Sequence, residues 1–446
     1  MNKKIGFVSL GCAKNLTDTE TMLGILNNKG YEITADVNEA EVIVVNTCAF
    51  IDSAKEESIS AILEMAEYKE NKCELLIVCG CLAQRYKDDI EVSLPEVDII
   101  LGTTDYAKIA DAIEDYYVKG EKNSMVGDCN SIVEYDLPRI RTTSSYSAYV
   151  KIADGCDNYC TYCIIPKLRG RYKSRPEESI LNEIKALAKE GVKEVILIAQ
   201  DTAYYGKDNG KYELASLLRR ISEIDGIEWI RLQYCYPENI TKELAEEIAH
   251  NPKVVKYLDM PLQHISDSVL KRMGRRSRQK EVEELIKHLR EKIENLVIRT
   301  SLIVGFPGES EEDFETLKKF LADYPLDRVG AFTYSCEEGT PAASFEDQIP
   351  DEVKKQRHSE IMELLREVSY KRNQQKIGSV TEAIIEGYDE ENFCYVGRTS
   401  QDTIEVDGTA YIYSKYELNA GDIVEIKILE ADEYDVTGEV VNEFTK

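Results

Sequence analysis

The segment AYVKIADGCDNYCTYC, residues 148–163, decides the fold of this chain. Its first part, 148–156, is a candidate β-strand, and the rest carries Cys156, Cys160 and Cys163 in a C-x3-C-x2-C pattern. Amphipathic helices separate it from five further candidate strands, at 194–202, 227–237, 254–264, 297–306 and 327–335. Six βα units predict a partial, open TIM-like barrel rather than a closed barrel of eight.

The cysteine loop at the end of the first barrel strand indicates a metal centre. Three closely spaced thiolates can hold three irons of a 4Fe–4S cluster and leave the fourth iron without a protein ligand. An open position on a metal is where a substrate or cofactor binds. The alternative is a zinc site that takes its fourth ligand from elsewhere. A location at the carboxyl end of a barrel strand favours the iron–sulfur interpretation, because barrel enzymes place their active sites there.

Upstream of the barrel, four apolar segments at 5–12, 41–48, 74–81 and 97–103 alternate with helices, which predicts a parallel sheet. Three of these strands end in Cys12, Cys48 and Cys81. The carboxyl ends of parallel strands meet at one edge, so the three thiols could converge on one metal centre. Cys79 is two residues before Cys81, and on a continuous strand both would point to the same face. Spacing alone therefore leaves either cysteine as the third ligand.

Downstream of a long helix expected at about 352–375, the pattern changes to short alternating β segments separated by Gly, Asp and Asn. This texture predicts a small antiparallel β-barrel or sandwich. A polar stretch at about 120–147 is the expected linker between the first two parts. The predicted domains are an N-terminal α/β domain at 1–125, a central barrel at 142–372 and a C-terminal β domain at 376–444.

Composition restricts the partners of this chain. The 446 residues carry a net charge of −28, which disfavours general binding to nucleic acid or anionic membranes. Residues 376–446 alone hold 17 acidic and five basic side chains. No apolar run approaches the roughly 18 residues of a membrane span, and we expect a cytosolic location. Twelve cysteines in that compartment point to metal or redox chemistry rather than to disulfides.

The loop CDNYCTYC after a barrel strand resembles the motif of radical S-adenosylmethionine enzymes, and the three-part chain resembles the methylthiotransferases among them. The resemblance implies a C-terminal domain of the TRAM type and S-adenosylmethionine as a cofactor. It also implies two 4Fe–4S clusters and a reducing electron donor. The implied ligands of the radical cluster are Cys156, Cys160 and Cys163. Those of the second cluster, implicated in sulfur transfer, are Cys12, Cys48 and, in preference to Cys79, Cys81.

Local motifs resemble one branch of these methylthiotransferases. They include SLGCAKNLTDTE at 9–20, IAQDTAYYG at 198–206 and LDMPLQHIS at 258–266. The resemblance implies methylthiolation of the β-carbon of an aspartate in the twelfth small-subunit ribosomal protein. That carbon has no acidic proton and no leaving group, so its chemistry requires a cofactor-derived radical. A tRNA adenosine methylthiotransferase is one alternative, although the acidic C-terminal region disfavours tRNA. A non-catalytic metal-binding scaffold with zinc is the other.

Polar residues at strand ends are the candidate cofactor contacts. Gln200, Asp201 and Thr202 end the second barrel strand, and Gln263 ends the fourth. Barrel geometry turns such residues toward the site, and the resemblance implies that the first three contact S-adenosylmethionine. Asp201 and Thr202 could equally serve as capping residues.

A basic stretch follows the cysteine loop. Either it is a solvated surface loop, or one of its arginines pairs with a carboxylate of the substrate or cofactor. Its members are Lys167, Arg169, Arg171, Lys173 and Arg175.

Overall fold

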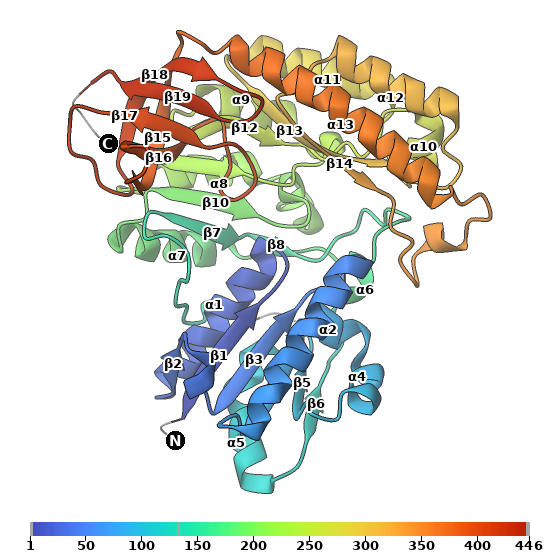
Figure 1. The fold of residues 1–446 in the computed structure, drawn as a ribbon, viewed down its shortest axis with the longest axis vertical. Helices are drawn as coiled ribbons and strands as arrows, with labels where there is room; N and C mark the ends of the chain where they lie inside the picture. The colour runs from blue at the N-terminus through green and yellow to red at the C-terminus, as the bar shows by residue number, and fades with distance from the viewer. Residues whose placement is uncertain (1–2, 132–133, 443–446) are drawn as a thin grey trace.

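A computed structural model describes residues 3–131 and 134–442, so the predicted domain limits at residues 1 and 444 lie outside the described residues. The chain forms three parts (Figure 1). The first is a six-stranded parallel sheet in the order β2-β1-β3-β4-β5-β6. Its strands are β1 (Lys4–Ser9), β2 (Glu32–Thr34), β3 (Val42–Thr47), β4 (Leu75–Gly80), β5 (Ile99–Leu101) and β6 (Asn123–Met125).

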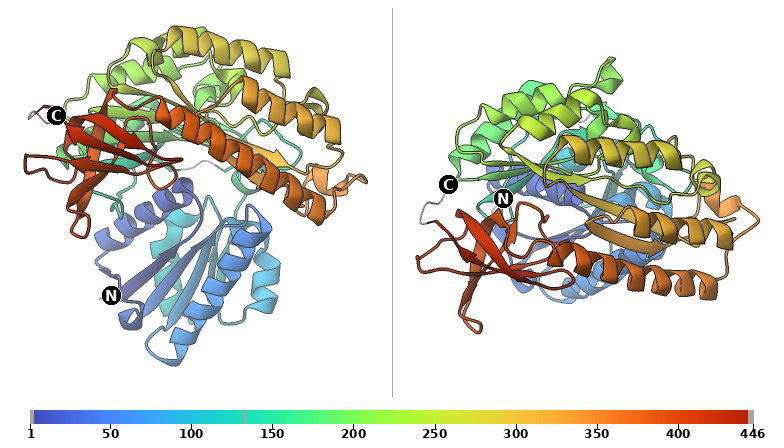
Figure 2. Two further views of the ribbon diagram at one scale, coloured as in Figure 1. Left: turned by 45° about the horizontal axis from the view of Figure 1, so that its top comes forward. Right: turned by 90° about the horizontal axis from the view of Figure 1, so that it is seen from above.

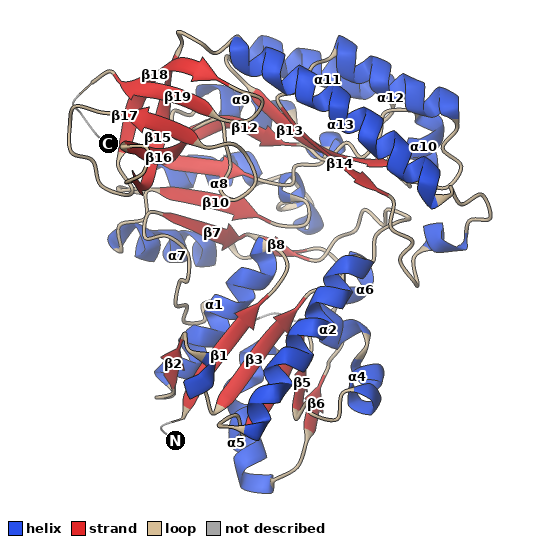
Figure 3. Ribbon diagram, in the orientation of Figure 1, coloured by secondary structure: helices blue, strands red, loops and turns tan. Residues whose placement is uncertain are grey.

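Helices cover both faces of this first sheet, as the fully buried strands β3 and β4 require. On one face, α1 (Ala13–Asn28) and α5 (Ile109–Lys119) pack against alternate residues of β3 and β4. On the other face lie α2 (Asp52–Glu67), α3 (Cys81–Arg85) and α4 (Lys87–Ser93). All these strands end at the upper edge of the sheet, which faces the second part of the molecule (Figure 3).

The second part is an open parallel sheet of six strands in the order β7-β10-β11-β12-β13-β14, which confirms the predicted incomplete barrel. The strands are β7 (Ser147–Lys151), β10 (Glu194–Ile198), β11 (Trp229–Leu232), β12 (Val254–Asp259), β13 (Val297–Val304) and β14 (Arg328–Thr333). Its helices are α7 (Glu177–Lys189), α8 (Leu214–Ser222), α9 (Lys242–His250), α10 (Asp267–Arg272), α11 (Gln279–Lys292), α12 (Glu311–Asp323) and α13 (Asp351–Gln374). They lie outside the curved sheet (Figure 2). A two-stranded ribbon, β8 (Ala153–Asp154) with β9 (Lys173–Ser174), brackets the cysteine loop and α6 (Ile165–Arg169).

The third part is a closed five-stranded barrel in the order β15-β16-β17-β19-β18. The strands are β15 (Val380–Asp389), β16 (Cys394–Thr399), β17 (Ala410–Tyr413), β18 (Ile423–Ala431) and β19 (Val436–Val440). Four pairings are antiparallel, as predicted, but β17 and β19 pair in parallel. The reason is topological: a closed ring of five strands cannot alternate direction at every pairing, so one neighbouring pair must run in parallel.

The third part docks on the amino ends of the open sheet. Arg398 of β16 enters the interface and pairs with Glu194, the first residue of β10, which Arg231 also contacts. Although burial alone raises its pKa, these two arginines lower the pKa of Glu194 to about 2. Among the described residues, no helix is both long and apolar enough to cross a membrane. Because the third part docks on the amino ends of the open sheet, it leaves the carboxyl ends free on the side of the cysteine loop.

Candidate functional site

The first cysteine set lies in the loop between β8 and α6. Cys156 and Cys160 are buried, and Cys163 is half-buried. Backbone hydrogen bonds hold the loop, with Cys156 N donating to Gly170 O at 3.1 Å and Cys163 N to Cys160 O at 3.0 Å. Burial raises the pKa of Cys156 to about 12, and a nearby thiolate at Cys160 adds to the effect. Such thiols ionise readily only when a cation joins them, which fits a metal-ligand role.

Unpaired polar atoms surround this loop. Gln200 Oε1, Arg275 Nε and Nη1, and the Tyr162 hydroxyl are buried and make no hydrogen bond with a described residue. The Arg275 guanidinium lies 4.1 Å from the ring centroid of Tyr236, whose hydroxyl is 3.9 Å from Cys160 Sγ. Buried donors and acceptors are normally satisfied, so this surface fits a polar cofactor and an anionic cluster.

The second cysteine set lies at the carboxyl edge of the first sheet. Cys12 precedes α1, Cys48 follows β3, and Cys81 begins α3. Gly11, at φ +87°, allows their approach, because a Cβ there would stand 2.8 Å from Cys48 Cβ. Burial raises the pKa of Cys81 to about 12, and thiolates at Cys12 and Cys48 oppose its ionisation further. The structure thus brings together the three thiols that sequence placed at this edge.

Cys79 lies elsewhere, and the expectation that it shares a face with Cys81 is wrong. Cys79 Sγ is 3.9 Å from Met22 Sδ, in the core on the α1 side of the sheet. Cys81 packs in the core on the opposite side. Gly80, at φ +91°, ends the strand and breaks the two-residue alternation between them.

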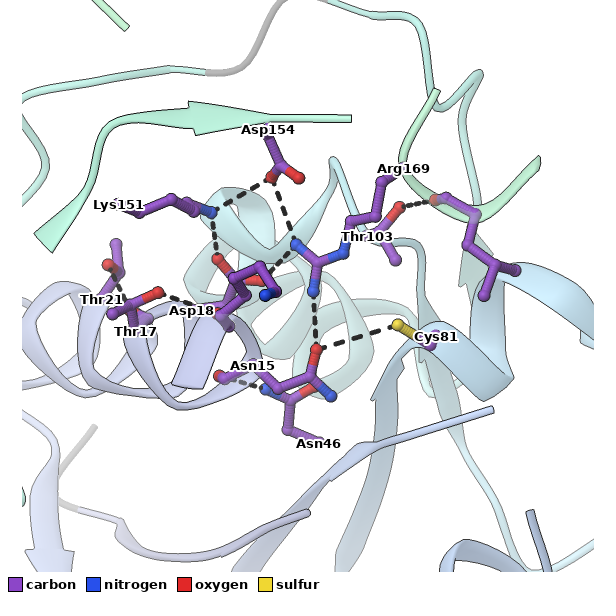
Figure 4. A network of polar contacts seen from close by, with 12 residues as sticks. Asn15, Thr17, Asp18, Thr21, Asn46, Cys81, Thr103, Lys151, Asp154 and Arg169 are labelled. Carbon is purple, nitrogen blue, oxygen red and sulfur yellow. Dashed lines mark hydrogen bonds and ion pairs between the residues drawn. The ribbon is translucent and has the colours of Figure 1, made fainter. Parts of the chain in front are cut away.

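A buried polar network reaches from Asp154, two residues before Cys156, to Asn15 beside Cys81 (Figure 4). Arg169 Nη1 lies 2.7 Å from Asp18 Oδ2 and 3.2 Å from Asp154 Oδ2. Its Nη2 donates to Asn15 Oδ1 at 2.6 Å, and that oxygen is 3.8 Å from Cys81 Sγ. Lys151 Nζ contacts both carboxylates as well, at 2.5 Å and 3.2 Å. Three elements of the barrel domain and one helix of the first domain meet in this network.

Charge complementarity keeps this network ionised. Burial alone would raise the pKa of Asp154, but Lys151 and Arg169 hold it well below its ordinary value. Cys12 keeps an exposed surface, and desolvation by the surrounding protein raises its pKa. Lys14 and Arg169, with nearby backbone N–H groups, outweigh that effect, so the net shift of the Cys12 pKa is downward.

Sequence reasoning did not identify this network. Its signal lies in NLTD at 15–18, where two polar residues three positions apart on an amphipathic helix share one face. Both Asn15 and Asp18 are buried. Arg169, by contrast, belongs to the basic stretch after the cysteine loop, and it is buried in ion pairs rather than facing solvent. Arg171 of the same stretch is exposed.

The candidate cofactor contacts occupy different surroundings. Gln200 Nε2 donates to Asp154 Oδ1 at 3.2 Å, and its oxygen is unpaired among the described residues. Asp201 accepts hydrogen bonds from Asn158 at 3.0 Å and Asn239 at 2.6 Å, and burial raises its pKa to about 6. These bonds tie the cysteine loop to the segment after β11.

The other two candidates lie four residues past the ends of β10 and β12. Thr202 Oγ1 donates to Gln233 O. Gln263 adopts a left-handed φ of +70°, and its side chain makes no hydrogen bond with a described residue. Their contacts with a cofactor stay predictions. Within the described ranges, no group of three or more His, Cys, Asp or Glu side chains is arranged to hold a single metal ion.

Comparison with known families agrees with the three parts. Residues 150–321 match the radical SAM superfamily, 4–102 match the uncharacterised protein family UPF0004, and 377–441 match the TRAM domain. The fold resembles the radical S-adenosylmethionine methyltransferase TsrM from Kitasatospora setae, with a TM-score of 0.53 over 77% of each chain at 14% identity. It also resembles the cobalamin-dependent radical enzyme OxsB, with a TM-score of 0.51 over 90% of this chain and 64% of the other at 12% identity.

Full-length relatives are much more similar. A protein of Acetivibrio thermocellus is 51% identical over the whole of both chains. Proteins of Clostridium tetani and Lachnoclostridium phytofermentans are 49% and 50% identical, over 99% and 98% of this chain and 99% of theirs. All three are named ribosomal protein uS12 methylthiotransferase RimO. With identity at this level along its entire length, the chain belongs to the RimO family of radical S-adenosylmethionine methylthiotransferases.

Proposed function

We propose that this enzyme methylthiolates the β-carbon of an aspartate in ribosomal protein uS12, with S-adenosylmethionine and two 4Fe–4S clusters as cofactors. The observation that carries the proposal is the pair of cysteine sets at one interdomain interface. The α6 segment follows Cys163 directly, and its Leu168 packs in the same core as Cys81. Its last residue, Arg169, contacts Asn15 beside Cys81. One short element therefore links the two cysteine sets, which supports the proposal.

The six cysteines divide the work between two clusters in this proposal. Cys156, Cys160 and Cys163 hold the radical cluster. When bound there, a 4Fe–4S cluster with one open iron supplies S-adenosylmethionine with the electron that generates a hydrogen-abstracting radical. The second cluster, associated with sulfur transfer, is held by Cys12, Cys48 and Cys81. Each set supplies three thiolates and leaves one iron open to a non-protein ligand.

The remaining residues of the rim orient the cofactor. Gln200 offers its unpaired oxygen to a donor group of S-adenosylmethionine, and Gln263 offers its free side-chain amide. Asp201 and Thr202 hold the neighbouring segments in place through their bonds to Asn239 and Gln233. The family resemblance implies cofactor contacts for Gln200, Asp201 and Thr202, and Gln263 joins them by its place after the fourth barrel strand. Position at the carboxyl ends of the barrel strands supports that assignment.

The partner in this proposal is a basic ribosomal protein in the cytoplasm, and a reducing donor supplies the electron. Supporting this, the net charge of −28 complements a basic protein and repels RNA. Within 376–446, Arg398 is buried against Glu194 and Asp402 is buried against Arg328, so these two burials leave the acidic balance of the TRAM surface unchanged. A tRNA substrate would instead require a basic face.

Two triple variants test the division of labour. Replacing Cys156, Cys160 and Cys163 by Ala should remove about half the iron and all reductive cleavage of S-adenosylmethionine. Replacing Cys12, Cys48 and Cys81 by Ala should remove the other half, preserve cleavage and abolish methylthiolated product. Mass spectrometry of uS12 and of tRNA nucleosides from cells lacking the enzyme identifies the substrate. Cleavage surviving in the first variant, or a modification missing from tRNA rather than uS12, would contradict the proposal.

A further inference from the structure

Lys14 projects from the first domain onto the rim of the barrel. It lies in the first turn of α1, two residues after Cys12, and is only 8% exposed. Its Nζ lies 3.8 Å from the ring centroid of Tyr234 and 3.4 Å from the carbonyl oxygen of Ala199. Both partners follow barrel strands, β11 and β10 respectively, and Ala199 directly precedes Gln200. The ammonium group thus lies where the two cysteine sets face each other.

Lys14 differs from the other buried cations at this interface in having no carboxylate partner among the described residues. Lys151 and Arg169 are each neutralised by Asp18 and Asp154. Among the described residues, no carboxylate lies within 4.0 Å of Lys14 Nζ. A desolvated ammonium without an anion is unfavourable, and an aromatic face with one long hydrogen bond offsets only part of that cost. The site is therefore suited to an incoming anion.

The platform beneath Lys14 is held in place before any ligand arrives. Tyr234 adopts φ +61°, a left-handed conformation that is unfavourable for a side chain of this size. Its backbone N–H donates to Asp259 Oδ2 at 3.0 Å, and its carbonyl accepts from Thr202 N at 2.8 Å. Residues Ala13 and Leu16 of α1 pack into the same small core as Tyr234. Strain that the surroundings maintain in this way is typical of functional positions.

We propose that Lys14 binds the side-chain carboxylate of the substrate aspartate and gives the enzyme its preference for aspartate over asparagine. The inference rests on the proposed function, because the anion it invokes is the group bonded to the carbon that is modified. Holding the carboxylate between the two metal centres places the adjacent β-carbon within the same space. The competing role for Lys14 is that of a counter-charge for the cluster at Cys12, because the positive charge of Lys14 lowers the pKa of the Cys12 thiol.

The test uses reconstituted full-length enzyme and two peptides covering the modified loop of uS12, one with the native aspartate and one with asparagine. In Lys14→Gln, iron content and substrate-free cleavage of S-adenosylmethionine should match wild type. Affinity for the aspartate peptide should fall about ten- to hundredfold, the range expected for a lost charge-assisted hydrogen bond. Affinity for the asparagine peptide should stay constant, and Lys14→Arg should restore part of the preference.

Lys29→Gln is the matched control, since Lys29 ends the same helix but is exposed and pairs with Glu114. Iron loss in Lys14→Gln would assign the residue to the cluster and overturn the inference. Equal weakening of both peptides, or no weakening of either, would overturn it as well. A wild-type enzyme that neither binds nor modifies uS12 would refute the proposed function itself, which separates the two failures.

Discussion

Gly11→Ala is the sharpest perturbation of the second cysteine set. Gly11 and Gly30 share the same left-handed φ of +87°, but their surroundings differ. A Cβ on Gly11 would lie 2.8 Å from Cys48 Cβ and 3.1 Å from Cys48 Sγ, whereas a Cβ on Gly30 would meet nothing within 4 Å. Gly30→Ala therefore reproduces the backbone strain without the steric contact, and the pair isolates the approach of Cys48 to Cys12.

The magnitudes follow from these contacts. Left-handed backbone costs an L-residue about 1–2 kcal/mol, so both variants should lose that much free energy of unfolding. Ordinary contact begins at 3.4 Å, so Cys48 must retreat by about 0.6 Å from a new Cβ at position 11. Overpacking of this kind adds about 1–3 kcal/mol. Metal sites tolerate errors of about 0.5 Å at most, so the second cluster should assemble poorly.

The assay is anaerobic reconstitution followed by iron determination and chemical denaturation. Gly11→Ala should fall from about eight irons per chain toward about four, because the radical cluster is untouched. It should still cleave S-adenosylmethionine but form little methylthiolated product. Gly30→Ala should keep its full iron complement. Equal iron content in the two variants would refute the argument that Gly11 is required for the approach of the cysteines.

Three further perturbations address the interface, the pH response and the partner. Arg169→Met leaves Asp18 and Asp154 short of a counter-charge and should lower the free energy of unfolding by about 3–5 kcal/mol. The exposed control Arg171→Met should lower it by about 0.5 kcal/mol or less, and similar losses in the two variants would contradict a stabilising role of the buried ion pairs. Burial lowers the pKa of His264 to about 4, so the native state binds fewer protons than the unfolded chain between about pH 4 and 6.5. Stability should then fall as the pH drops through that window, by about 3 kcal/mol more than in His264→Leu, and parallel pH profiles would exclude this origin. Changing the exposed Glu390, Glu391, Glu430 and Asp432 to Lys should slow association with uS12, most at low salt, and an unchanged association rate would remove the TRAM barrel from recognition.

Much of the fold can be predicted from the sequence because the patterns that indicate it are local. Buried parallel strands appear as continuous apolar runs, and the chain order of strands and helices limits the topology. Cys12, Cys48 and Cys81 each end such a run, so their common edge follows from the parallel arrangement. The face of each cysteine does not follow, because Gly80 changes it through a single backbone angle.

The docking of the domains has no comparable local signal. Arg169 sits among four other basic residues, and composition gives no reason to separate it from exposed Arg171. Its burial depends on Asn15 and Asp18, more than 150 positions away in the chain, which no periodicity connects to it. The same holds for Lys14, whose partners Ala199 and Tyr234 belong to another domain.

Stabilisation of the fold does not explain why the interdomain network consists of buried charges. Burying Lys151, Arg169, Asp18 and Asp154 carries a desolvation cost that well-packed apolar residues would avoid. Two apolar surfaces would still bury each other if one domain shifted by a residue along the other. These four charges, however, find their ion-pair partners only when α1 lies against β7 and α6 in one register. In the proposed reaction, hydrogen removal and sulfur attachment occur at one carbon, so the separation of the two cysteine sets must be fixed. A network that penalises every other register fixes it, and the residues that hold it lie directly beside the cysteines of both sets.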